Sequence, residues 1–276
     1  MSLSVQTNVA SLQAQANLAN TQKMLATNFQ RLSSGFRING AADDAAGLGI
    51  SNQMDAQISS YSVAERNTNN GISMAQTAEG ALGQVSTMVQ RLRGLAVEGS
   101  NGDLTSVDRG FLDTEFTSLK QEIDRISTST TYNGQALLSG AANTRTFQVG
   151  INNTANDQIG VGFGGIDLTS LGLNTSSVSG ATAGNAQASI DAADAALATI
   201  STQRANYGAS MNRMQVTVSN IQSMRTNLSA ANSRIKDVDV AEETAQMARN
   251  NVMSQAGAAV LAQANQAPQL AMKLLQ

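Results

Sequence analysis

Residues 190–235 read IDAADAALATISTQRANYGASMNRMQVTVSNIQSMRTNLSAANSRI, and apolar residues recur along them at alternating steps of three and four. This heptad repeat is typical of an α-helix that buries one narrow seam against partner helices. Only Arg204, Arg225 and Asn232 interrupt the seam. At about 1.5 Å per residue, one helix over this stretch would be roughly 70 Å long, so the sequence predicts a rod.

The same repeat marks other parts of the chain. It runs without a break over residues 75–96, is shorter over residues 112–126, and is weaker over residues 50–61. The chain has one proline, Pro268, so little in it would break a long helix. We expect each of these segments to be a helix packed along its neighbours.

Apolar stripes also run close to both ends of the chain. Chain ends usually fray, and they rarely carry long apolar stripes. These stripes therefore need a partner, and they pack either on each other or on other copies of the chain. The stripe positions that we expect to form self-assembly seams are Val5, Val9, Leu12, Leu25, Phe29, Leu32, Val252, Val260, Ala264, Ala267, Ala271 and Leu274.

A different pattern lies between the helices. Apolar residues alternate with polar residues or glycine over residues 147–151 and 159–163, which predicts two strands of a β-hairpin around the polar residues 152–158. Residues 164–189 are rich in Gly, Ser, Thr, Asn and Ala, and we expect a loop there. The predicted fold is mainly α, with long antiparallel helices in a coiled-coil-like rod, a small β-hairpin insert at about 143–188, and the N- and C-terminal helices paired at one end.

The composition excludes most kinds of chemistry. The chain has no His and no Cys, which removes the commonest transition-metal ligands, thiol nucleophiles and the usual proton carrier near neutral pH. Only 13% of its residues are charged and its net charge is −3, so it has no basic patch for nucleic acid. No stretch approaches the roughly 18 consecutive apolar residues of a membrane span. We expect a protein that is not an enzyme, with no cofactor, no metal, and no nucleic-acid or membrane partner.

Two short motifs could still carry chemistry. Residues 160–165 match G-x-G-x-x-G, but this motif binds a dinucleotide only where a strand leads into a helix, and residues 166–171 show no amphipathic helix. Asp43 and Asp44 could bind a cation, but no other oxygen ligands lie nearby at the spacing of a calcium loop. Acidic residues directly ahead of Ala45 are better explained as the start of a helix, where they complement the helix dipole.

Longer motifs near both ends resemble bacterial flagellins. The matching segments are 31–39 (RLSSGFRIN), 43–47 (DDAAG), 70–73 (NGIS), 75–82 (AQTAEGAL), 233–235 (SRI), 237–239 (DVD), 255–257 (QAG) and 260–266 (VLAQANQ). They occur in the family's order over about residues 1–140 and 190–276. The chain therefore resembles a short flagellin that lacks large outer domains.

The resemblance implies a structural subunit that polymerises into the extracellular flagellar filament for motility. It implies a terminal helical assembly domain, the inner core, at residues 1–45 and 235–276, and a helical rod domain at residues 46–234. In the family the two ends are disordered in the monomer and fold together on assembly. The N-terminus shows neither the cationic region nor the apolar region of a cleaved signal peptide, which fits secretion through a type III-like export channel.

The resemblance also implies partners. They are other copies of the chain, an export chaperone at the C-terminal helix, hook-associated and cap proteins, and a host Toll-like receptor that senses flagellin. The receptor surface of the family corresponds here to Gln90, Arg91, Leu95 and Glu115, whereas Glu98 departs from the amide usual at its position. Without the resemblance, these charged residues would be interpreted as a solvated helix face with weak ion pairs.

Two other interpretations stay open at this point. A hook–filament junction protein shares the same terminal architecture and would serve as an adaptor rather than as the bulk polymer. The coiled-coil signalling module of a chemotaxis receptor is also rich in Ala, Gln and Ser. That module would require a helical hairpin without a β insert and usually an attached membrane span.

Overall fold

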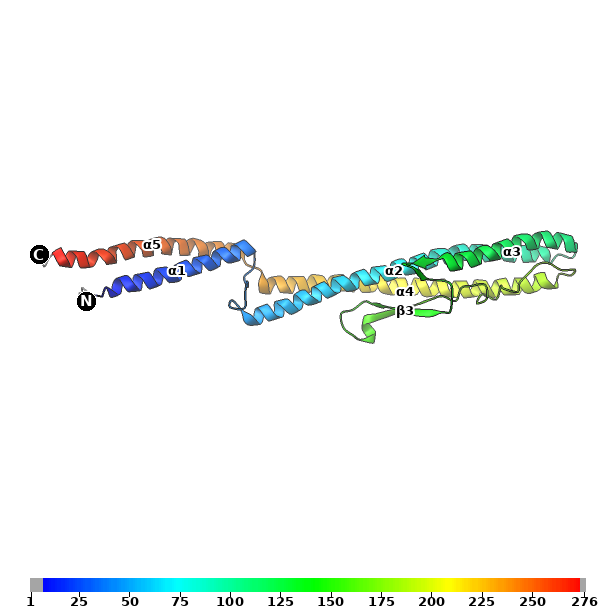
Figure 1. The fold of residues 1–276 in the computed structure, drawn as a ribbon, viewed down its shortest axis with the longest axis horizontal. Helices are drawn as coiled ribbons and strands as arrows, with labels where there is room; N and C mark the ends of the chain where they lie inside the picture. Colours follow the sequence, from blue (N-terminus) through cyan, green and yellow to red (C-terminus); the bar gives the residue numbers. More distant parts are fainter. Residues whose placement is uncertain (1–6, 274–276) are drawn as a thin grey trace. The chain divides into compact units, whose positions relative to one another are not determined.

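The computed structural model describes the backbone of residues 7–273 and the side chains of residues 7–266. Within that part, long α-helices dominate, as predicted (Figure 1). They are α1 (Val9–Ser34), α2 (Ala45–Gly99), α3 (Ser106–Ser129), α4 (Gly184–Lys236) and α5 (Val240–Lys273). The weak seam at residues 50–61 and the strong one at residues 75–96 belong to the single helix α2. Among the described helices, none has the length and hydrophobicity to cross a bilayer.

The chain divides into two compact units. The first consists of Met1–Ile58 and Thr226–Gln276, and the second of Ser59–Arg225. Helices α2 and α4 each contribute residues to both units. The assembly and rod domains expected from the resemblance, with boundaries near residues 45 and 235, stay a prediction.

The predicted heptad seams form the core of the second unit. Along α2 the seam residues Ala75, Ala78, Leu82, Val85, Val89, Leu92 and Ala96 are fully buried. Phe116 and Ile123 of α3 and Ile200 and Tyr207 of α4 are buried in the same cluster. Since successive seam residues lie on one face of each helix, the repeat alone determines which faces meet.

The three polar residues that interrupt the α4 seam each have an acidic partner on α2. Arg204 donates to Glu79 at 2.6 Å and Arg225 to Glu65 at 2.6 Å, both in the second unit. Asn232 donates to Asp55 at 2.7 Å in the first unit. Such partly exposed pairs contribute little stability, but each fits only one register of α2 against α4.

The predicted β-hairpin is confirmed, with a shifted first strand. Strands β3 (Asn143–Gln148) and β4 (Gln158–Phe163) pair antiparallel, and Ile159, Val161 and Phe163 alternate into the core. Val149 and Ile151 were predicted in the first strand but lie beyond it. The amides of Val149 and Gly150 both donate to the carbonyl of Asp157, which closes the loop and ends the strand early.

A second, very short hairpin was not predicted. Strands β1 (Thr131–Tyr132) and β2 (Gln135–Ala136) pair across Asn133 and Gly134. These two residues have φ values of 48° and 73°, which is the left-handed geometry that a two-residue hairpin turn requires. Asn-Gly is the preferred sequence for that turn, so the signal was present in the sequence.

The glycine-rich stretch after β4 is a packed loop that ends where α4 begins, at Gly184. Side chains of helix α3 hold it, among them Lys120 and Asp113. Lys120 donates to the carbonyls of Asn174 and Ser176 at 2.9 and 2.7 Å, and burial lowers the pKa of this lysine. Asp113 accepts hydrogen bonds from the Ser177 hydroxyl and the Val178 amide.

Gly71 marks a close approach of α2 to α4 and β3. A Cβ atom there would lie 2.9 Å from the sulfur of Met214 and 3.1 Å from the ring of Phe147. We expect Gly71→Ala to lower the free energy of unfolding by about 1–3 kcal/mol through overpacking. At Gly80, in the same helix, a Cβ atom would meet no atom of the other described elements within 4 Å, so Gly80→Ala is the matched control.

In Gly80→Ala the added methyl group restricts the unfolded chain, and we expect a gain of about 0.5–1 kcal/mol. Urea unfolding followed by circular dichroism measures both changes. Effects of the same sign in the two variants would contradict the close approach at Gly71.

Candidate functional site

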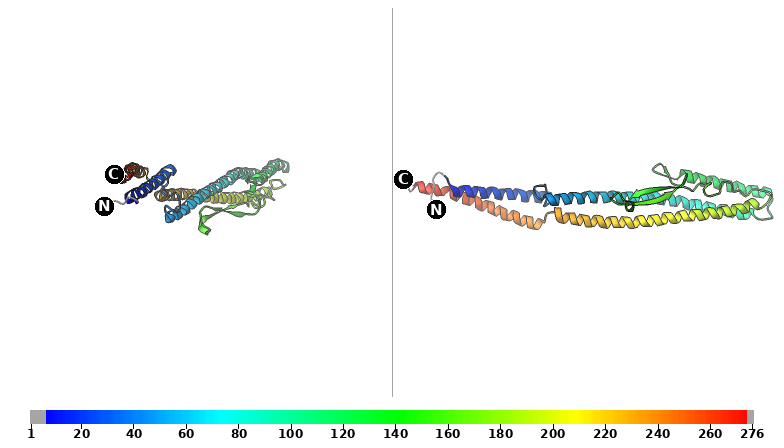
Figure 2. Two further views of the ribbon diagram at one scale, coloured as in Figure 1. Left: turned by 60° about the vertical axis from the view of Figure 1, so that its left-hand side comes forward. Right: turned by 90° about the horizontal axis from the view of Figure 1, so that it is seen from below.

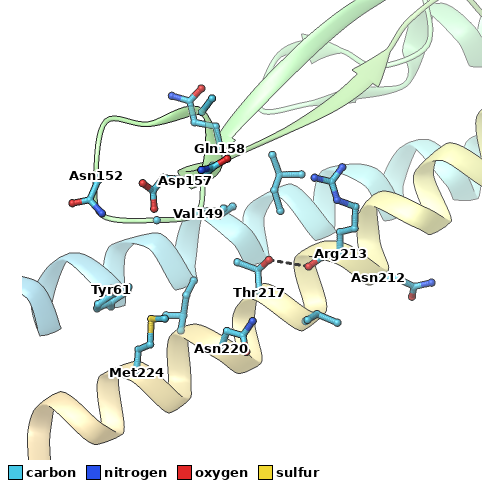
Figure 3. Close-up of a pocket in the computed structure, with 16 residues that line it drawn as sticks. Tyr61, Val149, Asn152, Asp157, Gln158, Asn212, Arg213, Thr217, Asn220 and Met224 are labelled. Carbon is cyan, nitrogen blue, oxygen red and sulfur yellow. Dashed lines mark hydrogen bonds between the residues drawn. The ribbon is translucent and has the colours of Figure 1, made fainter.

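A groove in the second unit is lined by polar and apolar side chains that form no arrangement of catalytic groups. It has a volume of about 840 Å³ and lies between α2, α4 and the loop that joins β3 to β4 (Figure 3). Asn152, Asp157, Asn212 and Asn220 line it with polar groups, over a partly apolar floor that includes Met224. The carboxylate of Asp157 accepts a hydrogen bond from Thr154 in its own loop. Within the described residues, no three His, Cys, Asp or Glu side chains cluster to hold a metal ion.

The two short motifs have structural roles. Gly160 and Gly162 lie in β4, and the next long helix begins only at Gly184, so residues 160–165 do not form the turn that holds a dinucleotide. Asp44 accepts a hydrogen bond from the amide of Gly47 at 2.8 Å and caps the start of α2. Asp43 accepts from the amides of the preceding turn. Asp44 therefore marks the helix start as its cap, whereas Asp43 stabilises the turn before it, and neither residue lies in the first turn of α2 as expected.

The motifs near the two ends of the chain meet in the first unit. Gly35 ends α1 with φ 75°, and its carbonyl accepts from the amide of Val238 at 3.0 Å. The amide of Arg37 donates to the carbonyl of Lys236 at 2.7 Å, and the Lys236 ammonium lies 4.8 Å from the centre of the Phe36 ring. Ile38 is buried beside them. The two links between helices therefore form one hydrogen-bonded crossover.

Helices α1 and α5 lie side by side, as expected, but they meet through an unexpected face (Figures 1 and 2). The residues turned away from solvent recur at alternating steps of three and four on both helices, and we call them the α1–α5 seam. On α1 they are Ser11, Ala14, Leu18, Thr21, Leu25, Asn28 and Leu32; on α5 they are Glu243, Met247, Asn250, Ser254, Gly257, Leu261 and Ala264. Much of this seam is polar or small.

Hydrogen bonds between the helices follow the seam and show that the pair is antiparallel. Asn8 and Ser11, near the start of α1, contact Ala264 and Asn265, near the end of α5. Further along, the Asn28 amide donates to Glu243, and Asn250 donates to the Asn28 carbonyl oxygen at 2.8 Å. These contacts satisfy polar groups that would otherwise be costly to bury.

The larger apolar residues of the predicted stripes lie outside this seam. Val9, Leu12, Phe29, Val252 and Val260, which we call the outer stripe, are between 55% and 67% exposed. Their own partner helix therefore leaves them uncovered.

The other predicted positions divide into two groups. Leu25, Leu32 and Ala264 are partly buried in the α1–α5 seam. Val5 and Leu274 lie outside the described residues. Ala267 and Ala271 lie in α5, but their side chains are beyond the described part.

The residues expected to face a receptor fall into two groups. Gln90 and Arg91 of α2 and Glu115 of α3 are exposed, and the Arg91 guanidinium donates to both carboxylate oxygens of Glu115 at 2.7 and 3.0 Å. Leu95 is fully buried, because it follows Leu92 by three residues and belongs to the same core face. Leu95 therefore does not contribute to an exposed surface in this structure, contrary to the expectation.

The polar part of the α1–α5 seam was missed in the sequence. Prediction of a seam relied on apolar residues, so Ser11, Thr21, Asn28, Glu243 and Asn250 were passed over. The signal was nevertheless present, because Glu243, Asn250, Gly257 and Ala264 are spaced by seven residues, as a heptad seam requires.

Comparison with known proteins gives one consistent result. The model of the bacterial flagellin N-terminal helical region matches residues 5–143, and that of the bacterial flagellin C-terminal helical region matches residues 190–275. The flagellin of Halalkalibacterium halodurans is 43% identical, over 94% of this chain and 93% of that protein. The flagellin of Bacillus subtilis is 38% identical, over 97% and 98%.

Two further similarities extend the comparison. The flagellar filament 33 kDa core protein of Treponema phagedenis is 37% identical, over 97% of this chain and 98% of that protein. A solved structure from Vibrio parahaemolyticus, described as a flagellar hook-associated protein, superposes with a TM-score of 0.59 over 71% of this chain and all of that chain. Its 16% identity supports a common fold and nothing finer.

The Arg91–Glu115 pair makes a prediction about acid titration. The hydrogen bond from Arg91 lowers the pKa of Glu115 below its ordinary value. As pH falls, Glu115 therefore stays ionised and paired with Arg91 through the range in which an ordinary glutamate takes up its proton. The pair is lost only at lower pH. We expect Arg91→Gln to raise the midpoint of Glu115, measured by ¹³C NMR of its carboxyl group. Arg93→Gln is the control, since Arg93 pairs with Asp194 instead, and an equal shift in both variants would refute the assignment.

Proposed function

Because the chain belongs to the bacterial flagellin family, and is therefore a structural subunit of the extracellular flagellar filament, we propose that its terminal helices are the surfaces through which it polymerises. The observation that carries the proposal is the outer stripe. The side chains of Phe29 in α1 and Val252 in α5 are more than half exposed. Both helices lie in the terminal regions of the chain that the two flagellin family models match. Exposed apolar stripes of this kind indicate a protein interface.

The energetics favour folding of the ends together with assembly. Fixing the backbone of one residue costs about 1–2 kcal/mol, and an isolated helix is marginal in water. Burial of a Val, Leu or Phe side chain returns about 1.5–3 kcal/mol, but the α1–α5 seam buries mainly small and polar groups. The pair therefore gains most of its apolar burial only when neighbouring copies cover the outer stripe. Assembly and ordering of the ends become one coupled step.

The comparisons favour a filament subunit over the two other interpretations. The flagellins of Halalkalibacterium halodurans and Bacillus subtilis are 43% and 38% identical over almost the whole chain, whereas the hook-associated structure is 16% identical. A chemotaxis-receptor module would need a helical hairpin without a β insert, and strands β3 and β4 occupy that place here.

Other partners follow from the same surface. Before assembly, a stripe such as Val252 and Val260 on α5 would promote premature association. A chaperone that covers this helix until export through a type III-like channel would prevent it. Hook-associated and cap proteins would then bind the terminal helices at the two ends of the growing filament.

The exposed pair of Arg91 and Glu115, with Gln90 beside it, is the part of the expected receptor surface that a Toll-like receptor could contact in the unassembled chain. Leu95 would act only by packing beneath that surface, because it is buried.

The outer stripe predicts a large effect on assembly. We expect Phe29→Ser to raise the critical concentration for filament growth about 10- to 100-fold, since loss of one buried Phe costs about 1.5–3 kcal/mol and each 1.4 kcal/mol is a factor of ten. Gln22→Ser, at an exposed polar position of α1, is the control and should leave assembly unchanged. Sedimentation of polymer at graded concentrations measures both. An unaltered critical concentration in Phe29→Ser would rule out this surface.

The receptor surface predicts a difference between two neighbouring arginines. In a cell reporter assay with unassembled protein, Arg91→Ala should lower the signal by tenfold or more, because the residue loses its contact and releases Glu115. Arg93→Ala removes a similar exposed charge that pairs with α4 and should signal like the parent. Equal signals from the two variants would contradict the proposal that the receptor contacts this surface.

A further inference from the structure

We propose that the polar contacts of the α1–α5 seam restrict α1 to one partner helix, an α5, in one antiparallel register. This inference rests on the proposed function, since pairing of the ends is part of assembly. It concerns which helices pair and how they align, whereas the outer stripe concerns how pairs join. Three groups of contacts carry it, two near the end of α5 and one near its start.

The first contact uses the only proline of the chain. Pro268 lies within α5 and has no amide hydrogen, so the carbonyl of Ala264, four residues earlier, lacks its donor in the helix. The side-chain amide of Asn8 donates to that carbonyl at 2.8 Å. The other end of the same side chain accepts the amide of Ser11 and caps α1. Asn8 therefore joins the start of α1 to the one carbonyl of α5 that the proline leaves open.

The second contact lies one turn further along. The Ser11 hydroxyl donates to the side-chain oxygen of Asn265 at 2.7 Å. Close packing continues at Gly257, where a Cβ atom would lie 3.9 Å from the Cβ of Leu18. A Cβ atom at Gly257 would thus make an ordinary van der Waals contact with Leu18, so the two positions face each other directly.

The third contact lies near the other end of the pair and is buried. Glu243 is 5% exposed and accepts a hydrogen bond from the side-chain amide of Asn28. Its other carboxylate oxygen, Oε2, lies 3.8 Å from Nη1 of Arg31. Asn250 is buried as well and donates to the carbonyl oxygen of Asn28 at 2.8 Å. Hydrogen bonds join the carboxylate and the two amides across the two helices, and the Arg31 guanidinium lies within ion-pair distance of the carboxylate.

These contacts reject other pairings. A slip of one heptad in either direction takes Glu243 away from Asn28 and leaves a buried carboxylate without an amide donor, which is strongly unfavourable. Pairing of two α5 helices places two Glu243 carboxylates in one seam without the Asn28 amide that donates to them, and pairing of two α1 helices leaves Asn28 without its carboxylate partner. The remaining seam residues, such as Ala14, Leu18 and Leu261, are aliphatic and would tolerate a slip. A single polar position is known to set the register of coiled coils in this way.

Introduced cysteines can report the register, because the chain has none of its own. Leu18→Cys with Gly257→Cys is the in-register probe, since its Cβ separation suits a disulfide. Leu18→Cys with Ala264→Cys is the slipped probe, because seven residues of helix add about 10 Å. After mild oxidation, we expect the in-register probe to cross-link at least ten times faster than the slipped probe in the parent background.

The test replaces the buried network by Asn28→Leu, Glu243→Leu and Asn250→Leu together. These changes keep a packed seam but remove its selectivity, so the slipped probe should cross-link at least fivefold faster than in the parent. Thr21→Val is the matched control: Thr21 is buried in the same seam, but its hydroxyl donates to Asn17 of its own helix. A triple variant that still cross-links only in register would overturn the proposal.

A second pair of variants tests the proline contact by a double-mutant cycle. Asn8→Ser keeps a helix cap but is too short to reach Ala264, and we expect it to slow in-register cross-linking about fivefold. In the Pro268→Ala background the restored backbone amide donates to the Ala264 carbonyl. There, Asn8→Ser should slow in-register cross-linking less than twofold. An equal effect of Asn8→Ser in both backgrounds would show that Asn8 acts as a cap alone.

The probes are read both in sedimented filaments and in the unassembled chain, which separates the two proposals. A parent chain that sediments but cross-links both probes equally overturns the register proposal and leaves the filament function standing. A parent chain that does not sediment yet keeps its in-register preference overturns the assembly surface and leaves the register standing.

Discussion

Helices α1 and α5 bury mainly polar and small side chains in their seam and leave several larger apolar side chains, such as Phe29 and Val252, turned outward. A pair built in this way gains little from its own contact, because the hydrophobic effect scales with the apolar area removed from water. The hydrogen bonds from Asn28 to Glu243 and from Asn250 to Asn28 satisfy buried groups, which prevents a penalty more than it supplies a gain. The favourable burial is left to neighbouring copies, which can cover Phe29 and Val252. This division of roles suits a subunit of a polymer, because the surface left exposed on one copy is available to the next.

The second unit has the opposite arrangement. Its seams bury large apolar side chains completely, among them Leu82, Phe116 and Ile200, and the arginines that interrupt the α4 repeat in this unit pair with acids on α2. Strand β4 adds Ile159, Val161 and Phe163 to the same cluster, and the ring of Phe163 lies 5.4 Å from that of Tyr207. This unit is stabilised by its own core and does not need a neighbour. The contrast between the two units therefore comes from what fills the heptad positions, since the repeat itself is the same.

That contrast also explains what the sequence could predict. The helices over residues 75–96, 112–126 and 190–235 were evident because apolar residues fill their seams. The α1–α5 seam escaped prediction because Ser11, Asn28 and Glu243 fill the same positions with polar groups, and the apolar stripe beside it was taken for the contact. The end of β3 depends on two hydrogen bonds to the Asp157 carbonyl, which no alternation of residues reports. Leu95 was placed on a surface by resemblance, although its spacing from Leu92 indicates the core.

Contacts at both ends of the α1–α5 pair also limit how the chain can change in length. Ser11 bonds Asn265 at one end of the pair, and Asn28 bonds Asn250 at the other. Both bonds can form only if the segment between these residues has a matching length on each helix. An insertion or deletion in one of these segments moves one set of partners out of reach unless the other helix changes by the same number. The loop between β4 and α4 is held by Asp113 and Lys120 and by buried side chains such as Leu173, and no second segment has to match its length. We therefore expect a change of length in α1 or α5 to be tolerated only when the partner helix changes with it.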